Sequence, residues 1–341
     1  MHMSDALLSP AVGGAFWLAA GGLVAYSARK ISAENDNSKT ALMGVAGAFI
    51  FAAQMINFTI PGTGSSGHLG GGLILAALLG PYRAFITLAS VLVIQCLFFA
   101  DGGLLALGCN IFNLAFFPAF IAYPYIYRVI AGAGDGRSRL AAGCMAGAVA
   151  GLLMGAFSVV VQTTMSGISD LSFTSFLLFM LPIHLAIGIV EGVVSFLVIS
   201  FVMQAQPDIL PSSPERLHPS RHVLAVFAIA ALITGGVISS FASSNPDGLE
   251  WSITKVTGKE ELEGPGNSFE GFLASVQDKL AFLPDYAFKS SSVGDEGRAS
   301  FIPANIGTSV AGVVGGLMVF SLAGLAGATL RNRWRRRPVD A

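Results

Sequence analysis

Long apolar segments that carry almost no charge dominate this chain. A helix that crosses a bilayer needs about 20 mostly apolar residues, and fewer where other helices bury it. Charged residues make up 11% of the 341 residues, less than half of the roughly 25% of a typical soluble domain. We therefore expect an all-α polytopic membrane protein with about nine transmembrane helices. The nine segments are 10–28, 41–58, 68–80, 82–100, 109–130, 140–165, 173–203, 222–243 and 304–330.

The third segment, 68–80, is short and rich in glycine, with Gly70, Gly71 and Gly72 near its start. Backbone that does not span is tolerated at membrane depth where protein covers it. Two interpretations of this segment stay open: a full crossing, or a re-entrant helix buried inside the bundle.

The basic residues favour one orientation of these helices. Short cytoplasmic connections carry an excess of Lys and Arg. If the N-terminus lies outside, 14 of the 19 basic residues fall on the cytoplasmic side, and the other five lie in the polar insert 245–302. We therefore expect a plasma membrane (inner membrane) protein with a cytoplasmic C-terminus. The 14 residues are Arg29, Lys30, Lys39, Arg83, Arg128, Arg137, Arg139, Arg216, Arg221, Arg331, Arg333, Arg335, Arg336 and Arg337.

Repeated prolines divide the chain into two parts. Pro207, Pro211, Pro214 and Pro219 cannot continue a helix, so residues 204–221 are expected to form a cytoplasmic linker. The linker separates a seven-helix body, 1–203, from a two-helix segment, 222–330, whose extracytoplasmic loop is 245–302. A basic cytoplasmic tail, 331–341, follows.

Several functions are excluded by what the sequence lacks. The only Gly-Lys pair is Gly258-Lys259, without the preceding phosphate-binding loop, so the chain is not expected to hydrolyse ATP. No HExxH, GxSxG or CxxC motif occurs, and an enzyme is not expected. No basic face exists outside the tail, so nucleic acid is not an expected partner, and no cofactor is expected.

Two histidines are predicted to share the outer face of the membrane. His2 lies at the N-terminus and His68 follows the loop 59–67. The amine of Met1, the amide nitrogen of His2 and its imidazole can close two small chelate rings on one metal if the metal displaces the amide proton, and His68 can add a fourth nitrogen. Planar nitrogen coordination selects Ni(II) or Cu(II) over Zn(II). The alternative is that His2 is an arbitrary residue on a frayed terminus.

Other polar residues within or beside the apolar segments leave more than one interpretation. His184 and Glu191 are two turns apart on one helix face, as a structural pair, a path element or a ligand. Asp101, Asn110 and Asn113 either orient a ligating histidine or cap and pack a helix start.

Several separated motifs resemble the CbiM/NikM family, the substrate-binding membrane components of energy-coupling-factor (ECF) nickel and cobalt transporters. The resemblance covers about 1–203. The motifs are the start Met1–Pro10, Ser66–Gly71, Gly80-Pro81, Leu97–Leu104, Leu107–Asn113 and His184–Gly192.

The segment Asn245–Trp251 resembles the PDGLE signature of the small NikN-type partner, and 222–330 fits the form of that partner. The chain thus resembles a natural fusion, which favours nickel over cobalt as the transported ion. The PDGLE segment is expected to shape the outer loops without binding metal itself.

The resemblance implies that the metal ligands are the Met1 amine, the His2 amide and imidazole, and His68. The family start usually has Ile at position 3 and Gly-Phe at positions 6 and 7, where this chain has Met3, Ala6 and Leu7. These changes leave the chelating atoms untouched and alter the packing around them.

The resemblance also implies an ATP-binding cassette (ABC) importer. The chain would capture Ni²⁺ (or Co²⁺) outside and dock on a transmembrane coupling subunit that rides on cytoplasmic ATPase subunits. Ala11, Ala15 and Ala19 form a small-residue stripe that fits helix packing or such docking. Two alternatives stay open: a cobalt-specific component serving cobalamin biosynthesis, and a stand-alone secondary transporter.

Overall fold

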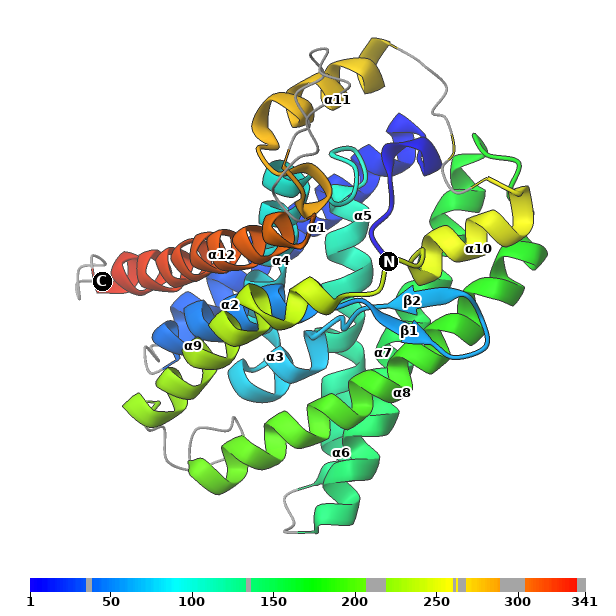
Figure 1. Cartoon of the computed structure of the whole chain (residues 1–341). Helices are drawn as coiled ribbons and strands as arrows, with labels where there is room; N and C mark the ends of the chain where they lie inside the picture. The colour runs from blue at the N-terminus through cyan, green and yellow to red at the C-terminus, as the bar shows by residue number, and fades with distance from the viewer. Residues whose placement is uncertain are drawn as a thin grey trace.

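The computed structural model describes residues 1–34, 39–132, 136–206, 219–259, 262, 268–288 and 304–335. Helices make up nearly all of its regular structure (Figure 1). In chain order the elements are η1 (Asp5–Leu7), α1 (Pro10–Glu34), α2 (Thr40–Gln54), β1 (Phe58–Ile60), β2 (Ser65–Gly67), α3 (Gly72–Leu79), α4 (Pro81–Phe99), α5 (Leu107–Ile111), η2 (Phe112–Tyr127), α6 (Arg128–Ala131), α7 (Arg137–Ser166), α8 (Phe173–Ala205), α9 (Arg221–Gly236), η4 (Ile238–Phe241), α10 (Gly248–Thr257), α11 (Ser268–Leu280), η5 (Pro284–Tyr286) and α12 (Ala304–Arg335).

Each of the nine predicted segments contains a helix, but within the described residues only seven stretches are long and apolar enough to span a membrane. The continuous helix 107–131, formed by α5, η2 and α6, is one of the seven. The two short ones are α2, with 15 residues, and α3, with 8. By helix length, the described residues therefore contain fewer spans than the nine expected. The predicted linker 204–221 lies mostly outside the described residues.

Helix α3 is short because glycine ends it on both sides. Gly71 before it has φ +74° and Gly80 after it has φ +82°, a left-handed region that non-glycine residues rarely adopt. Eight residues extend about 12 Å at 1.5 Å per residue, less than half of a 30 Å hydrocarbon core. All eight residues are buried. Of the two interpretations left open for 68–80, the short helix inside the bundle is the one observed.

The helices run back and forth between two ends of the bundle. At one end, Arg83 at the start of α4 pairs with Glu34 at the end of α1. There too, Ser32 Oγ donates to the carbonyl of Leu330 in α12 at 3.4 Å. The opposite end gathers the N-terminus, the antiparallel β1–β2 hairpin and α10 (Figure 1). That second end holds the polar residues described below.

Close backbone contact joins the two helices of the C-terminal part. A Cβ atom placed on Gly312 of α12 would lie 2.1 Å from the carbonyl oxygen of Gly235 in α9. Real Cβ atoms do not approach backbone so closely, so the glycines let the two helices meet directly.

Gly312→Ala is therefore expected to force α9 and α12 apart and to destabilise the protein by about 1–3 kcal/mol. The thermal unfolding midpoint of the detergent-solubilised protein measures this loss. Gly324→Ala on the same helix is the control, because a Cβ atom there meets nothing within 4 Å. Equal midpoints for the two variants would contradict the close contact.

Candidate metal centre

Apolar burial and backbone hydrogen bonds fix the N-terminal segment. The side chains of Met1, Met3, Leu7 and Leu8 are all buried, with Met3 and Leu8 at 0% exposure. The peptide of Met3 is held on both sides, because its N–H donates to Asn110 Oδ1 at 2.8 Å and its carbonyl accepts from Gly103 N at 2.9 Å. The terminus is therefore a packed part of the fold and does not fray.

His68 presents one bare nitrogen to the chain terminus. The residue follows strand β2, and its Nδ1 lies 3.1 Å from the carbonyl oxygen of Leu69. A carbonyl only accepts, so Nδ1 carries the hydrogen and Nε2 of the neutral ring has a free lone pair. That Nε2 lies 3.1 Å from the amine nitrogen of Met1.

The His2 ring stacks on His68, with ring centroids 5.2 Å apart and planes 21° apart. Its Nδ1 lies 3.2 Å from Asp101 Oδ1, and its Nε2 lies 3.2 Å from Gln95 Oε1. The other oxygen of Asp101 accepts a hydrogen bond from the Tyr286 hydroxyl at 2.5 Å. The two histidines, 66 positions apart in the sequence, are thus brought together as expected.

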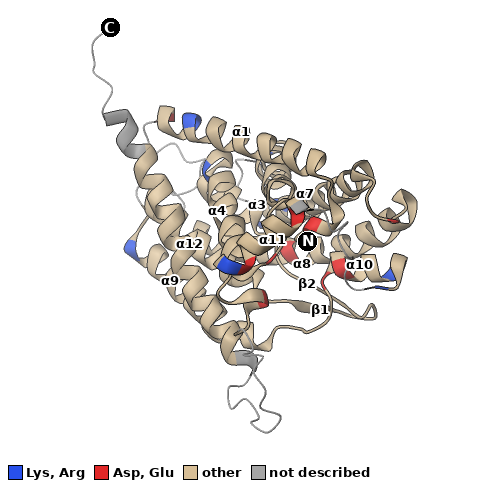
Figure 2. Ribbon diagram, turned by 90° about the horizontal axis from the view of Figure 1, so that it is seen from above, with Lys and Arg blue, Asp and Glu red and all other residues tan. Residues whose placement is uncertain are grey.

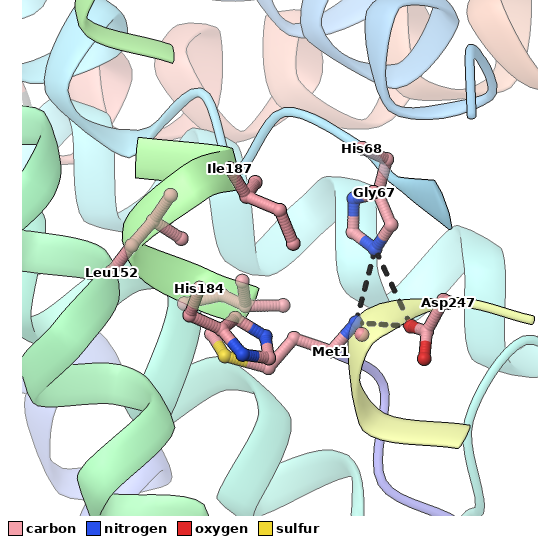
Figure 3. Close-up of a pocket in the computed structure, with 10 residues that line it drawn as sticks. Met1, Gly67, His68, Leu152, His184, Ile187 and Asp247 are labelled. Atoms are coloured by element: carbon pink, nitrogen blue, oxygen red, sulfur yellow. Dashed lines mark hydrogen bonds and ion pairs between the residues drawn. The ribbon is translucent and has the colours of Figure 1, made fainter. Parts of the chain in front are cut away.

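Asp247 completes the cluster from the C-terminal part of the chain. Its Oδ2 lies 2.6 Å from the Met1 amine and 3.9 Å from His68 Nε2 (Figure 3). Its Oδ1 caps α10 by accepting from the N–H groups of Leu249 and Glu250. The sequence offered the Asp247–Glu250 spacing of a capping box, but gave no reason to place this carboxylate on the N-terminus.

Burial and mutual charge set the protonation of these groups. Burial, with the charge of the Met1 ammonium, lowers the pKa of His68 to about 3, and burial also lowers the pKa of His2. Burial alone would raise the pKa of Asp247, but the ammonium outweighs it and lowers that pKa below its usual range. Near neutral pH the cluster therefore contains neutral imidazoles beside an ionised carboxylate.

An acidic vestibule leads to the two histidines. It has a volume of about 600 Å³, and its described lining includes five acidic residues with no Lys or Arg. Ribbon segments of acidic residues, red in Figure 2, lie around the N-terminus. Three wall residues, Ala100, Asp285 and Tyr286, have positive φ, which is strained for non-glycine residues. The five acids are Asp5, Asp101, Asp247, Glu250 and Asp285.

A second, very small cavity is lined in part by Met1. Its volume of about 10 Å³ holds roughly one water-sized particle, and Met1, His68, His184 and Asp247 are among its lining residues (Figure 3). His184 Nδ1 lies 2.8 Å from the Met180 carbonyl, while its buried Nε2 has no hydrogen-bond partner. His184 is thus placed beside the cluster.

Glu191 holds the segment that carries His68. Its two carboxylate oxygens accept from Gly70 N at 2.7 Å and Gly71 N at 3.1 Å. Glu191 and His184 therefore do not form the hydrogen-bonded pair that was one interpretation of their spacing.

The remaining candidates separate into two groups. Asp101 contacts the His2 ring and Asn110 holds the Met3 peptide, so both lie at the cluster. Asn113 instead forms a reciprocal amide pair with Gln162. The stripe of Ala11, Ala15 and Ala19 lies exposed on α1.

Side chains alone do not form a metal site here. Within the described residues, no group of three His, Cys, Asp or Glu side chains is arranged to hold a metal ion. The Met1 amine adds a nitrogen to this cluster, because it lies 3.1 Å from the lone pair of His68 Nε2.

Taken together, these features define a multi-pass membrane protein with a buried cluster of nitrogen donors at one end. The chain belongs to the CbiM family: the profile of the cobalt uptake substrate-specific transmembrane region matches residues 2–209, and that of the PDGLE domain matches residues 221–332. It is a nickel/cobalt uptake component, a transport protein and not an enzyme.

Relatives named for both metals are similar to this chain. A relative from Archaeoglobus fulgidus, whose name places it with the fused nickel transport proteins NikMN, is 33% identical to this chain. The match covers 94% of this chain and 96% of the length of that relative. The fused nickel transport protein NikMN of Rhodobacter capsulatus is 27% identical over 84% of this chain and 88% of its own length. The cobalt transport protein CbiM of Sorangium cellulosum is 27% identical over 62% of this chain and 94% of its own length.

A solved structure also matches. The crystal structure of a truncated transition metal transporter aligns with a TM-score of 0.53 at 31% identity, covering 60% of this chain and 99% of that one.

Acid is expected to destabilise the metal-free protein through His68. An unfolded histidine has a pKa of about 6.5, whereas burial lowers that of folded His68 to about 3. Between these values the unfolded state binds more protons, so the free energy of unfolding falls as the pH drops from 6.5 towards 3. Thermal unfolding at pH 7 and pH 4.5 measures the fall. His68→Gln does not titrate and should show a smaller fall; an equal fall would refute this assignment.

Asp247→Asn is expected to destabilise the metal-free protein by about 1–3 kcal/mol, because the Met1 ammonium loses its buried counter-charge. The Asn oxygen can still cap α10, so the variant isolates the charge. Thermal unfolding in detergent gives the loss. Asp170→Asn, at an exposed loop position, is the matched control and should leave the midpoint unchanged. An unchanged unfolding midpoint of Asp247→Asn would rule out the ion pair as a source of stability.

Proposed function

We propose that this chain captures Ni²⁺ from outside the cell with four nitrogens: the Met1 amine, the His2 amide, His2 Nδ1 and His68 Nε2. The observation that carries the proposal is the convergence of the Met1 amine and the bare Nε2 of His68, 3.1 Å apart. Metal–nitrogen bonds of about 2.0–2.1 Å place two neighbouring ligands roughly 2.8–3.4 Å apart, for angles from planar to tetrahedral. The separation suits two ligands on one ion.

The donor set favours nickel. The amine, the adjacent amide and the His2 imidazole close two fused chelate rings, and such rings hold three nitrogens near one plane. Planar nitrogen coordination suits Ni(II), whereas cobalt and zinc are better served by other geometries. The PDGLE domain adds to this preference, because relatives that share both parts carry names for fused nickel transport.

Asp247 stabilises the bound cation without being a ligand in this proposal. Metal binding releases one proton from the Met1 ammonium and one from the His2 amide, because both nitrogens must be deprotonated to become ligands. The Met1 nitrogen then gives its freed lone pair to the metal and keeps two hydrogens, one of them for the carboxylate 2.6 Å away. The nearby negative charge lowers the energy of the dication, and the acidic vestibule raises the local concentration of cations at its mouth. The metal displaces Asp101 from His2 Nδ1, where it now lies at 3.2 Å.

Energy for inward transport comes from partners in this proposal. The chain has no nucleotide-binding loop of its own. As a CbiM-family component it would dock on a transmembrane coupling subunit driven by cytoplasmic ATPases, and the exposed stripe of Ala11, Ala15 and Ala19 on α1 is a suitable docking face. The body and the PDGLE part, joined by residues 204–221, act as one unit because both contribute to the cluster.

Nickel titration of the purified full chain tests the proposal. The unmodified protein is expected to bind one Ni²⁺ with the diamagnetic spectrum of a planar nickel site. His2→Ala, His68→Ala and a one-residue extension before Met1 should each lower affinity by at least about 100-fold, since each removes a ligand. His222→Ala, an exposed histidine at the start of α9, is the control. Intact mass of the unmodified protein verifies that the chain starts at Met1.

Three results would count against it. Tight nickel binding by the extended protein would show that the amine is not a ligand. Nickel uptake into sealed, ATP-free vesicles by this chain alone would show that partners are not required. A response to cobalt with none to nickel would reverse the choice of ion.

A further inference from the structure

A continuous chain of hydrogen bonds joins His2 to the segment that carries His68. His2 Nε2 lies 3.2 Å from Gln95 Oε1, and Gln95 Nε2 donates to Gln54 Oε1 at 2.9 Å. Gln54 Nε2 then donates to the carbonyl of Gly70 at 2.8 Å. Gln54 and Gln95 are 4% and 1% exposed, so water does not replace these contacts. Neither glutamine is used as a ligand in the proposed function.

This series of hydrogen bonds has a fixed direction. The Gly70 carbonyl only accepts, so the amide NH₂ of Gln54 faces it and Gln54 Oε1 faces Gln95. The NH₂ of Gln95 must then face Gln54, which leaves Gln95 Oε1 towards His2. An amide oxygen only accepts, so Gln95 favours the tautomer of a neutral His2 ring that has the hydrogen on Nε2 and the lone pair on Nδ1.

This tautomer is the one that the chelate needs. Nδ1 is the imidazole nitrogen close enough to the His2 amide to close a six-membered ring with the metal. Asp101 Oδ1 lies 3.2 Å from the same nitrogen and, as an acceptor, favours the opposite tautomer, with the hydrogen on Nδ1. Gln95 and Asp101 thus compete for the single hydrogen of the ring.

We propose that Gln95 and Gln54 are positioning residues that hold His2 as the Nε2–H tautomer and leave Nδ1 free for the metal. The carbonyls of two consecutive residues then select the ligand atoms of both histidines. Leu69 fixes the bare Nε2 of His68 directly, and Gly70 fixes the bare Nδ1 of His2 through the two glutamines. The consequence for metal binding rests on the proposed function, whereas the tautomer itself does not.

A packing role for the two glutamines would look different. Asn113 and Gln162 form a reciprocal pair in which each amide donates to the other, at 2.7 and 2.8 Å. Their other hydrogen bonds go to Met3 Sδ and Ser158 Oγ, and no histidine is attached. The pair of Gln54 and Gln95 is open at both ends, with a carbonyl at one and the His2 ring at the other. Only the open arrangement can favour one tautomer of the imidazole.

Long-range ¹H–¹⁵N correlation of the metal-free full chain, labelled with ¹⁵N-histidine, reads the tautomer directly. The signals missing in His2→Ala identify His2. The wild type is expected to show the Nε2–H tautomer. Gln95→Met removes the acceptor, so the hydrogen should move towards Nδ1, and nickel affinity should fall about 10–100-fold. Gln95→Glu restores an acceptor and should keep the Nε2–H tautomer.

Gln162→Leu is the matched control, because it breaks a buried amide pair that has no hydrogen bond to the His2 ring and should leave the tautomer unchanged. Gln54→Met, which frees the Gln95 amide to turn, gives a second test if Gln95→Met fails to fold, and should yield a mixture of tautomers. An unchanged Nε2–H tautomer in the folded glutamine-to-methionine variant would overturn the proposal. If the wild type shows this tautomer but His2→Ala still binds nickel tightly, the proposed function fails while the positioning role stands.

Discussion

A buried amine at the chain terminus sets the arrangement of this end of the molecule. An ammonium taken out of water costs several kcal/mol unless a counter-charge and hydrogen bonds accompany it. The carboxylate of Asp247 lies 2.6 Å away and the His68 lone pair 3.1 Å away, so both needs are met. To meet them, the start of the chain, the hairpin after α2 and the segment before α10 must converge, and this convergence forms the wall of the vestibule.

A ligand set that includes backbone nitrogen requires a backbone that does not move. Here Met3 and Leu7 are buried and Asn110 holds the Met3 peptide from both its amide nitrogen and its oxygen. At positions 3 and 7 the sequence also departs from the usual start of the family, because Met3 and Leu7 stand in place of Ile and Phe. The substituted side chains are apolar, so they keep the segment packed and the proposed ligand atoms stay where the peptide places them.

Much of the fold was predictable because long apolar helices can be recognised in a sequence from their length and composition. Helix α3 was ambiguous, since Gly71 and Gly80 end it through their backbone conformation and not through a change in polarity. The meeting of His2 and His68 followed from the expected topology, but Asp247 could not be placed, because no local pattern links residue 247 to residue 1. Gln54 and Gln95 gave only a weak signal, because a buried amide acquires a direction only from its neighbours.

The position of Asp247 in the C-terminal part has a consequence for assembly. Were the PDGLE part a separate polypeptide, the amine would keep its carboxylate only at partner concentrations above the dissociation constant of that complex. Covalent connection turns the encounter into an intramolecular one, for which effective concentrations on the order of millimolar are typical of short flexible linkers. One gene product then guarantees a one-to-one ratio of the Met1 amine and its counter-charge, however sparsely the protein is expressed.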